Sequence, residues 1–500
     1  MVKQVSGGWV PVKLEPGFHK LDFHSVSHES TRRSMIKGAL GLGALALSEM
    51  LRATANQKSP PVPAKFNHRG YLGWITDLAS EPDRSAAWPS MRLDAQLLKD
   101  YRESFAAMRR LGFNEISVWG LYVSRAWPVD IASSVTRERG TLVEKLIDAA
   151  HRLGIRVYSG LGVYSWGFDD IIRAHPKLNR GNANAMCASE AESWLWMQKV
   201  LDFVFQRFEI DGVSLQSADQ GRCRCAQCKA FSDAEYHALL NVRVSEYIRS
   251  RWPKKTIGVN SWGMKFEEPE TLPSLKKISE KVDYLIDVHD TSRKRDLGYR
   301  KKIIDSLSCD FGTLGGPQVE PPQHWERDRW FLPTLKNVAV HLQELSSEGG
   351  RACEYFFHIL ANPADELSFW LAGKVLSNPT RSWEKHLEDS VEELYQVQQK
   401  TARDALAQIF LDAEQAYTRH LPARMSGTIS MEPLVSDRPG PPVYLTKRLS
   451  AEQRATYASE LTGIKARAEK LMPEMSQQAK PKMERVVRCL SNVLKDAGGV

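Results

Sequence analysis

Four of the seven cysteines are spaced as metal ligands or disulfide partners would be. Cys223, Cys225 and Cys228 lie close together, and Cys187 precedes a predicted helix that can return the chain toward them. Four thiolates suit a closed tetrahedral zinc site, which would brace the surrounding loop. Disulfide bonds formed after export are the alternative, because Cys-x-Cys-x-x-Cys without a second matching pair is weaker than paired Cys-x-x-Cys knuckles. The other cysteines are expected to be buried apolar residues: Cys309, Cys353 and Cys489.

Carboxylates follow several of the predicted strands. Hydrolysis of a glycosidic bond needs two carboxyl groups that flank it, about 5–5.5 Å apart for retention or about 6.5–9.5 Å apart for inversion. We predict Asp219 as the proton donor and Glu354 as nucleophile, base or stabiliser, with Asp290 and Glu320 in reserve. For each residue taken alone, an ion pair or a solvated loop position is an equally good interpretation.

Aromatic and amide side chains occur at the same strand ends. Indole and phenol rings can stack on the C–H face of a sugar, while neighbouring polar groups bind its hydroxyls. A single tryptophan near a strand end more often packs under a loop, so the prediction rests on the group. The predicted substrate-binding residues are Trp119, Tyr164, Trp166, Gln220, Asn260, Trp262 and His289. His289 and His358 could orient a sugar hydroxyl or be ordinary hydrogen-bonded residues.

These residues are carried by apolar runs of strand length that alternate with segments of helical period. The predicted strands are Tyr71–Thr76, Glu115–Gly120, Arg156–Tyr164, Gly212–Ser217, Thr256–Trp262, Tyr284–His289, Asp310–Gly315 and Arg351–His358. Eight such strands in parallel order predict the α/β class and a closed (β/α)₈ TIM barrel. Catalytic groups of this fold lie at the C-terminal ends of the strands.

The intervening helices have clear ends. Apolar residues spaced by three and four precede Gly112, and a second such run precedes Gly154, so each glycine is predicted to end a helix. No Gly-x-Gly-x-x-Gly motif follows the first strand, which gives a dinucleotide-binding fold no support. After Ser382 the strand patterns stop, and Trp383–Leu421 and Leu449–Ala497 are predicted to be amphipathic helices. We therefore predict a barrel over residues 67–381 and a helical appendage over residues 382–500.

The segment from Cys187 to Cys228 resembles a known group of enzymes. An Asp-Gly strand followed by an acidic residue and Cys-x-Cys-x-x-Cys, with a cysteine-containing phrase one helix earlier, is similar to barrel glycoside hydrolases of the β-hexosaminidase, α-glucuronidase and endo-β-N-acetylglucosaminidase kind. The resemblance covers mainly residues 70 to 380. In the hexosaminidases an Asp-Glu pair ends the fourth strand, with Glu as general acid. Asp219 matches that Asp, but Gln220 replaces the Glu, and an amide cannot protonate a leaving group.

The first 55 residues resemble a twin-arginine signal peptide. Arg32-Arg33 is followed by an apolar run from Gly38 to Leu47 and by an Ala-Thr-Ala sequence that ends at Ala55. We expect cleavage after Ala55 and a proline-rich linker over residues 56–66. A basic patch before a short buried helix is the alternative. Export through the twin-arginine machinery would deliver a periplasmic or extracellular protein without a stable membrane span.

The composition is that of a globular protein, with 42% hydrophobic and 26% charged residues. The formal charge of +8 is modest for this length and forms no basic stripe, so nucleic-acid binding is not expected. Our leading hypothesis is an exported glycoside hydrolase that acts on a glycan or polysaccharide without a catalytic cofactor. A non-catalytic glycan-binding barrel and a metal-dependent sugar isomerase or lyase are the alternatives; the latter would draw its ligands from Asp77, His289 and Asp290.

Overall fold

The computed structural model describes most of the chain after residue 64. The described residues are 2–5, 8–11, 65–75, 93–123, 126–217, 221–260, 264–266, 268–288, 298–315, 331–356, 362–420 and 449–497. Residues 1–62 and 63–500 form separate units. In the first unit, β1 (Val2–Val5) pairs antiparallel with β2 (Gly8–Pro11). The twin-arginine motif and the expected cleavage site lie outside the described residues.

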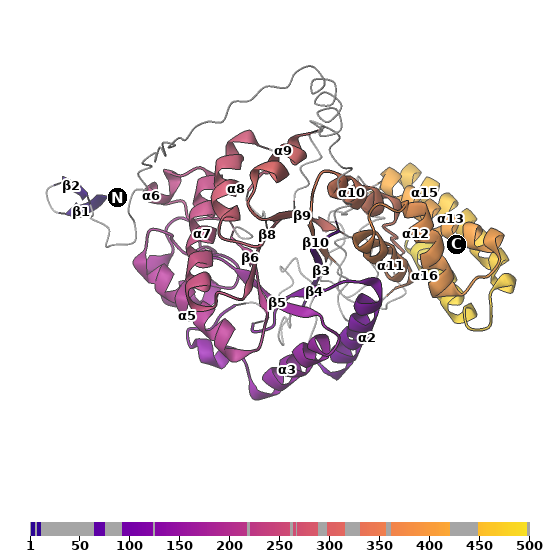
Figure 1. Cartoon of the computed structure of the whole chain (residues 1–500), viewed down its shortest axis with the longest axis horizontal. Helices are drawn as coiled ribbons and strands as arrows, with labels where there is room; N and C mark the ends of the chain where they lie inside the picture. The colour runs from indigo at the N-terminus through magenta and orange to yellow at the C-terminus, as the bar shows by residue number, and fades with distance from the viewer. Residues whose placement is uncertain are drawn as a thin grey trace, which may run out of the picture. The chain divides into compact units, whose positions relative to one another are not determined.

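The second unit contains a closed barrel of eight parallel strands, which confirms the predicted fold class (Figure 1). The strand order is β10-β3-β4-β5-β6-β7-β8-β9, so the last strand closes the barrel against the first. The first strand begins three residues before the predicted Tyr71, at His68. The strands are β3 (His68–Trp74), β4 (Glu115–Trp119), β5 (Arg156–Gly162), β6 (Gly212–Gln216), β7 (Thr256–Asn260), β8 (Tyr284–Asp287), β9 (Asp310–Gly315) and β10 (Ala352–Phe356).

Helices connect successive strands and surround the barrel (Figure 1). The longer ones bury an apolar face against the strands, as in α2, where Leu97, Tyr101 and Phe105 are all buried. The helices are α2 (Ala95–Leu111), α3 (Arg137–His151), α4 (Asp169–Ala174), α5 (Ala191–Arg207), α6 (Ala226–Lys229), α7 (Asp233–Arg251), α8 (Leu272–Ser279), α9 (Tyr299–Ser306), α10 (Lys336–Ser347) and α11 (Pro363–Ser377).

Local chemistry sets the ends of these helices. The Asp94 carboxylate accepts a hydrogen bond from the Leu97 backbone N–H at 2.8 Å and caps the start of α2. Gly112 ends the same helix with a φ of 84°, and Gly154 has a φ of 69° after α3. Both values lie in the left-handed region that glycine adopts at little cost, so the predicted helix ends are confirmed.

Inside the barrel, glycines on some strands make room for large side chains from their neighbours. A Cβ added at Gly160 of β5 would lie 2.3 Å from the ring of Trp119 on β4. A Cβ at Gly258 of β7 would lie 2.2 Å from the ring of Tyr284 on β8. Because the barrel interior is tightly packed, these two aromatic rings fit only where the neighbouring strand has a glycine.

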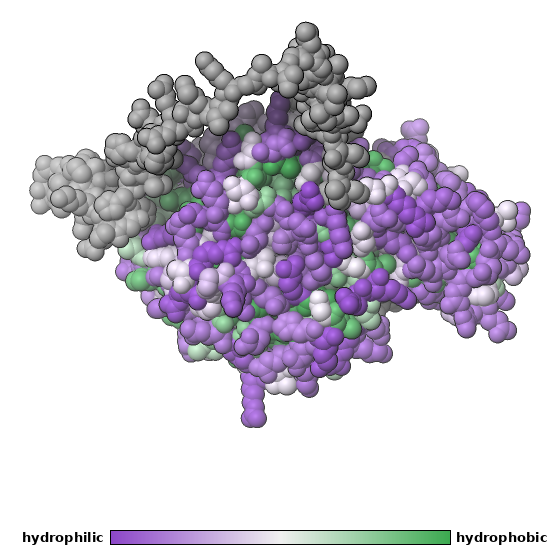
Figure 2. Space-filling view, in the orientation of Figure 1, coloured by the Kyte–Doolittle hydropathy of each residue, from purple (hydrophilic) through white to green (hydrophobic). Residues whose placement is uncertain are grey.

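The C-terminal region forms helices α12 (Trp383–Tyr395), α13 (Lys400–His420), α15 (Ala451–Leu471) and α16 (Lys480–Asp496). Each predicted amphipathic stretch thus holds two helices, and Gln396 ends α12 with a φ of 51°. The face shown in Figure 2 is mostly hydrophilic over these helices. No helix among the described residues is long and apolar enough to cross a bilayer.

The buried carboxylate of Glu414 connects this appendage to the barrel. It lies on α13 and accepts backbone hydrogen bonds from Leu335 and Lys336, both at 2.9 Å, and from Asn337 at 3.2 Å. These N–H groups belong to the start of α10, where a helix has unsatisfied donors and a positive dipole end. The contact stabilises the docking of α13 on the barrel helix.

Candidate functional site

Two tryptophans meet inside the barrel near the C-terminal ends of its strands. Trp119 ends β4, and Trp166 lies in the loop after β5; their ring centroids are 4.9 Å apart in an edge-to-face arrangement. Both rings are buried, with 1% of Trp119 and 4% of Trp166 exposed. The pair therefore belongs to an apolar cluster inside the barrel, near the C-terminal ends of β4 and β5.

The loop that carries Trp166 has an unusual backbone. Tyr164 has a φ of 63° and Trp166 a φ of 39°, values that non-glycine residues rarely adopt. A Cβ at Gly162 would lie 2.3 Å from the backbone oxygens of Ser165 and Trp166, so the loop folds back tightly on the end of β5. Ser165 between them forms a β-bridge with Ala185. Strained loops of this kind are common where a site needs a fixed side-chain position.

Tyr164 differs from the other predicted aromatic residues in its surroundings. Its ring belongs to the core cluster shared by strands and helices, whereas Trp119 and Trp166 belong to the cluster inside the barrel. Burial raises the pKa of the Tyr164 phenol, and the guanidinium of Arg243 on α7 lowers it in part. Tyr164 is 1% exposed and packs in the core cluster, and its proposed contact with a sugar stays a prediction.

An amide pair lies at the C-terminal ends of two adjacent strands. Asn260 of β7 donates from Nδ2 to Oε1 of Gln216 on β6 at 3.4 Å, and each residue is 3% exposed. Asn260 was predicted from its place at a strand end, whereas Gln216 was missed. The signal for Gln216 was available, because it lies next to the C-terminal end of the predicted strand Gly212–Ser217, where site residues of this fold are expected. Amides can bind sugar hydroxyls as donors and acceptors.

Glu354 lies deeper in the barrel than the predicted catalytic role implied. Its Oε1 accepts hydrogen bonds from the hydroxyls of Ser117 at 3.0 Å and Tyr284 at 3.1 Å. The residue is 1% exposed, and burial raises the pKa of its carboxyl. The contributing strands are β4, β8 and β10, three of the alternate strands that supply one packed layer of such a barrel. Glu354 therefore lies in the barrel interior, on the eighth strand as predicted from the sequence.

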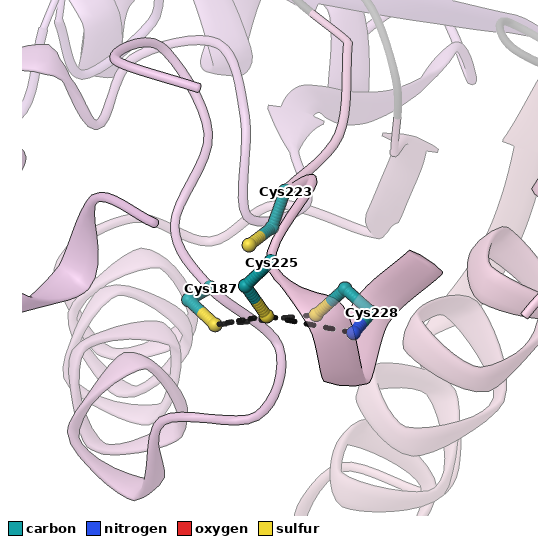
Figure 3. Close-up of side chains that lie close together, drawn as sticks. All are labelled: Cys187, Cys223, Cys225 and Cys228. Carbon is teal, nitrogen blue, oxygen red and sulfur yellow. Dashed lines mark hydrogen bonds between the residues drawn. The ribbon is translucent and has the colours of Figure 1, made fainter. Parts of the chain in front are cut away.

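The four predicted cysteine ligands lie together (Figure 3). Their sulfur atoms are all within 4.8 Å of one another, with 3.7 Å between the Sγ atoms of Cys187 and Cys225 and 3.9 Å between those of Cys187 and Cys228. Cys225 caps α6, and its Sγ accepts from the Cys228 backbone N–H at 3.4 Å. Hydrogen bonds from Cys223 and Cys228 lower the pKa of the Cys187 thiol. The structure thus brings Cys187 next to three cysteines that lie at least 36 residues later in the sequence.

Arg222 adjoins this cluster and was not predicted as a contact of it. Its guanidinium pairs with Asp233 at 2.7 Å, donates to the backbone oxygens of Cys228 and Phe231, and lies 4.3 Å from the ring centre of Tyr236. Its position directly before Cys223 in the sequence could have indicated this contact. These contacts connect Arg222 to the end of α6 and to the start of α7.

Most of the other predicted site residues lie outside the described residues: Asp219, Gln220, Asp290, Glu320, Trp262, His289, His358 and Asp77. Their positions in the sequence can still be related to the described strands. Asp219 comes three residues after the end of β6, and Asp290 comes three residues after the end of β8. Glu320 comes five residues after the end of β9. The strands before these three carboxylates are parallel, so their C-terminal ends point to the same end of the barrel.

Comparisons with known proteins identify similar folds. No family model and no curated protein sequence matches the chain. Among solved structures, an enzyme of glycoside hydrolase family GH138 that targets the pectin rhamnogalacturonan II is similar with a TM-score of 0.55 and 9% identity over 90% of this chain and 59% of that chain. The chain thus spans less than two thirds of that enzyme.

Two further structures have lower scores. A mutant O-GlcNAc hydrolase of Thermobaculum terrenum has a TM-score of 0.48 and 11% identity over 86% of this chain and 82% of that chain. The protein CpGH84B has a TM-score of 0.47 and 11% identity over 86% of this chain and 67% of that chain. The chain therefore has the closed parallel barrel of the GH138 enzyme, and the likeness concerns the fold.

Proposed function

We propose that the chain is an exported glycoside hydrolase that cleaves glycosidic bonds at the C-terminal end of its barrel. The observation that carries the proposal is the common direction of β6, β8 and β9, which lead into the segments with Asp219, Asp290 and Glu320. Active sites of (β/α)₈ enzymes are built from the loops at this end. The barrel fold is one that a glycoside hydrolase also has.

The proposed chemistry needs one acid and one further carboxylate. Asp219 would protonate the glycosidic oxygen, because it is the carboxylate that follows the fourth strand of the barrel. This departs from the hexosaminidases that the sequence resembles, whose general acid is the Glu that Gln220 replaces here. The second carboxylate would support the positive charge that develops at the sugar carbon. We assign that role to Asp290 or Glu320 in preference to Glu354, since Glu354 is 1% exposed and bonded within the packed layer.

Trp166 and Asn260 would bind the sugar from below. An indole offers an apolar face for the C–H groups of the ring, and an amide can bind a hydroxyl. The substrate class is therefore a glycan or polysaccharide whose sugar is recognised by one stacking face and a few polar groups.

The first experiment measures the release of reducing ends from a panel of polysaccharides and aryl glycosides by the purified full chain. Asp219→Asn should lower turnover by about 10²–10⁴-fold while glycan binding, measured by calorimetry, stays within about twofold, because an amide binds but cannot donate the proton. Asp290→Asn and Glu320→Gln identify the second carboxylate by the same loss. Asp305→Asn, on the exposed face of α9, is the matched control. Unchanged turnover in Asp219→Asn would remove this residue from the mechanism.

A non-catalytic glycan-binding barrel is the second candidate, and Gln220 favours it because the resembling hexosaminidases have an acid there. In this case the wild-type chain would bind glycans without releasing reducing ends. Gln220→Glu then becomes informative. Hydrolysis gained by this single substitution would show that the barrel retains a catalytic arrangement that lacks only its acid.

Export can be tested separately from catalysis. The first 55 residues fused to a folded reporter should carry it out of the cytoplasm of a bacterium that has the twin-arginine machinery. Replacing Arg32 and Arg33 together with lysine should keep the reporter inside, although the charge is unchanged, because the export signal requires the paired arginines. Export of the double variant would contradict the assignment.

A further inference from the structure

We infer that Cys187, Cys223, Cys225 and Cys228 form a closed structural zinc site that ties two loops at the C-terminal end of the barrel together. The inference does not depend on the proposed hydrolase activity. It rests on the distances among the four sulfur atoms, on their burial, and on the donors around them.

The sulfur positions fit a single tetrahedral ion. A Zn–S bond of about 2.3 Å places the sulfur atoms of a tetrahedral site about 3.8 Å apart. The Sγ of Cys187 lies 3.7 Å from that of Cys225 and 3.9 Å from that of Cys228, and the whole set lies within 4.8 Å. A cluster of several iron atoms would hold its thiolates farther apart. The spacing therefore favours one ion.

The same distances give no preference to a particular disulfide. A disulfide bond joins two sulfur atoms about 2.05 Å apart and uses each sulfur once. Cys187 is nearly equidistant from Cys225 and Cys228, so neither forms a distinct pair with it. One disulfide would also leave two of the four thiols buried together without a common partner, and two disulfides would require two distinct close pairs. One ion satisfies all four.

Burial shows which kind of zinc site this would be. Cys187 and Cys223 are fully buried, Cys228 is 2% exposed, and Cys225 is half-buried. Four protein ligands leave no position for a catalytic water, which is the arrangement of structural zinc sites. The Ser189 hydroxyl lies 2.9 Å from the Cys187 sulfur, and the Cys228 N–H bonds to the Cys225 sulfur. Such donors stabilise thiolate ligands.

Zinc binding displaces the proton of each thiol, so four protons leave and the site carries a net charge of −2. The Cys223 thiol donates to the backbone oxygen of Arg180 at 3.1 Å, and loss of its proton ends this hydrogen bond. The sulfur is then available to the ion. No electrons are transferred, because Zn²⁺ has no redox chemistry.

The position of the site defines its role in the fold. Cys187 precedes α5 on the connection from β5, whereas the other three cysteines lie on the connection from β6 to α7. The six residues between Gln216 at the end of β6 and Cys223 include Asp219. Zinc would fix one end of this segment while the strand fixes the other. The ion would hold this loop in place without touching a substrate.

The test measures metal and thiols in the full chain purified without chelator. Elemental analysis should find about one zinc per chain, and the denatured protein with chelator should titrate all seven cysteines as thiols. Cys223→Ser and Cys225→Ser should lose most of the zinc. Cys309→Ser, which removes a half-buried thiol outside the cluster, should keep it. A metal-free chain with five or three titratable thiols would overturn the inference in favour of disulfides.

Metal exchange in the wild-type chain keeps the test decisive if the serine variants fail to fold. Zinc removed by a chelator and replaced by Co²⁺ should give thiolate-to-cobalt charge transfer and the intense visible bands of a tetrahedral site. Zinc added back should abolish both signals. Weak bands of an octahedral ion, or iron in place of zinc in the chain as purified, would overturn the assignment.

Discussion

Two glutamates inside the barrel are equally buried and yet have different surroundings. Glu115 and Glu354 are each 1% exposed. At the N-terminal end, Glu115 pairs with Arg156 at 2.6 Å and lies 3.2 Å from the His68 imidazole. Deeper inside, the Glu354 oxygen accepts from the hydroxyls of Ser117 and Tyr284. A guanidinium offsets part of the cost of burying a carboxylate, whereas Glu354 has only hydroxyl partners and burial raises the pKa of its carboxyl.

Glu414 in the helical appendage is an intermediate case. Its bonding partners are three backbone N–H groups at a helix start, which supply partial charges in place of a full one. Burial raises the pKa of Glu414 to about 7, and these hydrogen bonds offset part of the rise. The three sites thus rank by how well the protein compensates a buried negative charge. Single substitutions can test that ranking.

The largest effect is expected when Arg156 is replaced. Arg156→Met leaves Glu115 buried beside a histidine and should lower the free energy of unfolding by about 2–3 kcal/mol. This is below the range for a fully buried pair, because the Arg156 side chain is 40% exposed. Urea unfolding at pH 7 measures the loss. Arg152→Met, at an exposed site after α3, is the control and should change stability by less than about 0.5 kcal/mol. Adding Glu115→Gln should recover part of the loss, and a purely additive double variant would contradict the charge argument.

A smaller effect is expected at Glu414. Glu414→Gln places an amide N–H₂ against one of three backbone donors. Near pH 5 it should cost at most about 1 kcal/mol, because the carboxyl with a pKa of about 7 is then protonated and also places an O–H there. The wild-type chain binds a proton at Glu414 more tightly when folded, so stability should fall as the pH rises from about 4.5 to about 7. The variant lacks this contribution. An unchanged slope of stability against pH in Glu414→Gln would show that this carboxylate is not the source.

Substitution of Glu354 should mainly change how the free energy of unfolding depends on pH. Its pKa is raised in the folded state, so its contribution to stability is greatest below the ordinary glutamate value and is lost as the pH rises toward the raised value. Glu354→Gln is neutral at every pH and should differ from the wild type by no more than about 1 kcal/mol in acid. At higher pH the free energy of unfolding of the variant should rise relative to that of the wild type. Denaturant titrations between pH 4 and pH 8 measure it, and parallel curves would contradict a raised pKa.

The smallest effect is expected from the hydroxyl donor Tyr284. Tyr284→Phe removes one hydrogen bond to Glu354 and should cost about 1 kcal/mol at pH 7. Because that bond lowers the pKa of Glu354, its loss should extend the pH range over which stability falls. Glu354→Gln combined with Tyr284→Phe should remove this extension. A pH profile that Tyr284→Phe leaves unchanged would show that this hydrogen bond does not lower the pKa of Glu354.

Local patterns in the sequence were sufficient for the architecture. The eight strand segments, the helix ends at Gly112 and Gly154, and the appendage after Ser382 follow from apolar periodicity and from residues with special backbone preferences. Such signals act within a few residues, and closure of eight parallel strands follows from their number and order. The sequence did not predict the break between α12 and α13. That break lies at Gln396, whose left-handed conformation is unusual for a glutamine.

The depth and partners of side chains were decided by the tertiary structure. Sequence placed Glu354, Tyr164 and Trp166 together at strand ends, but barrel closure buries the carboxylate between alternate strands and sends the two rings into different clusters. In the same way, the spacing of Cys223, Cys225 and Cys228 was visible in the chain, while the approach of Cys187 depends on how α5 packs. Periodicity gives the face of a strand, but which atoms meet across a barrel is set by its register and by the space that glycines such as Gly160 leave.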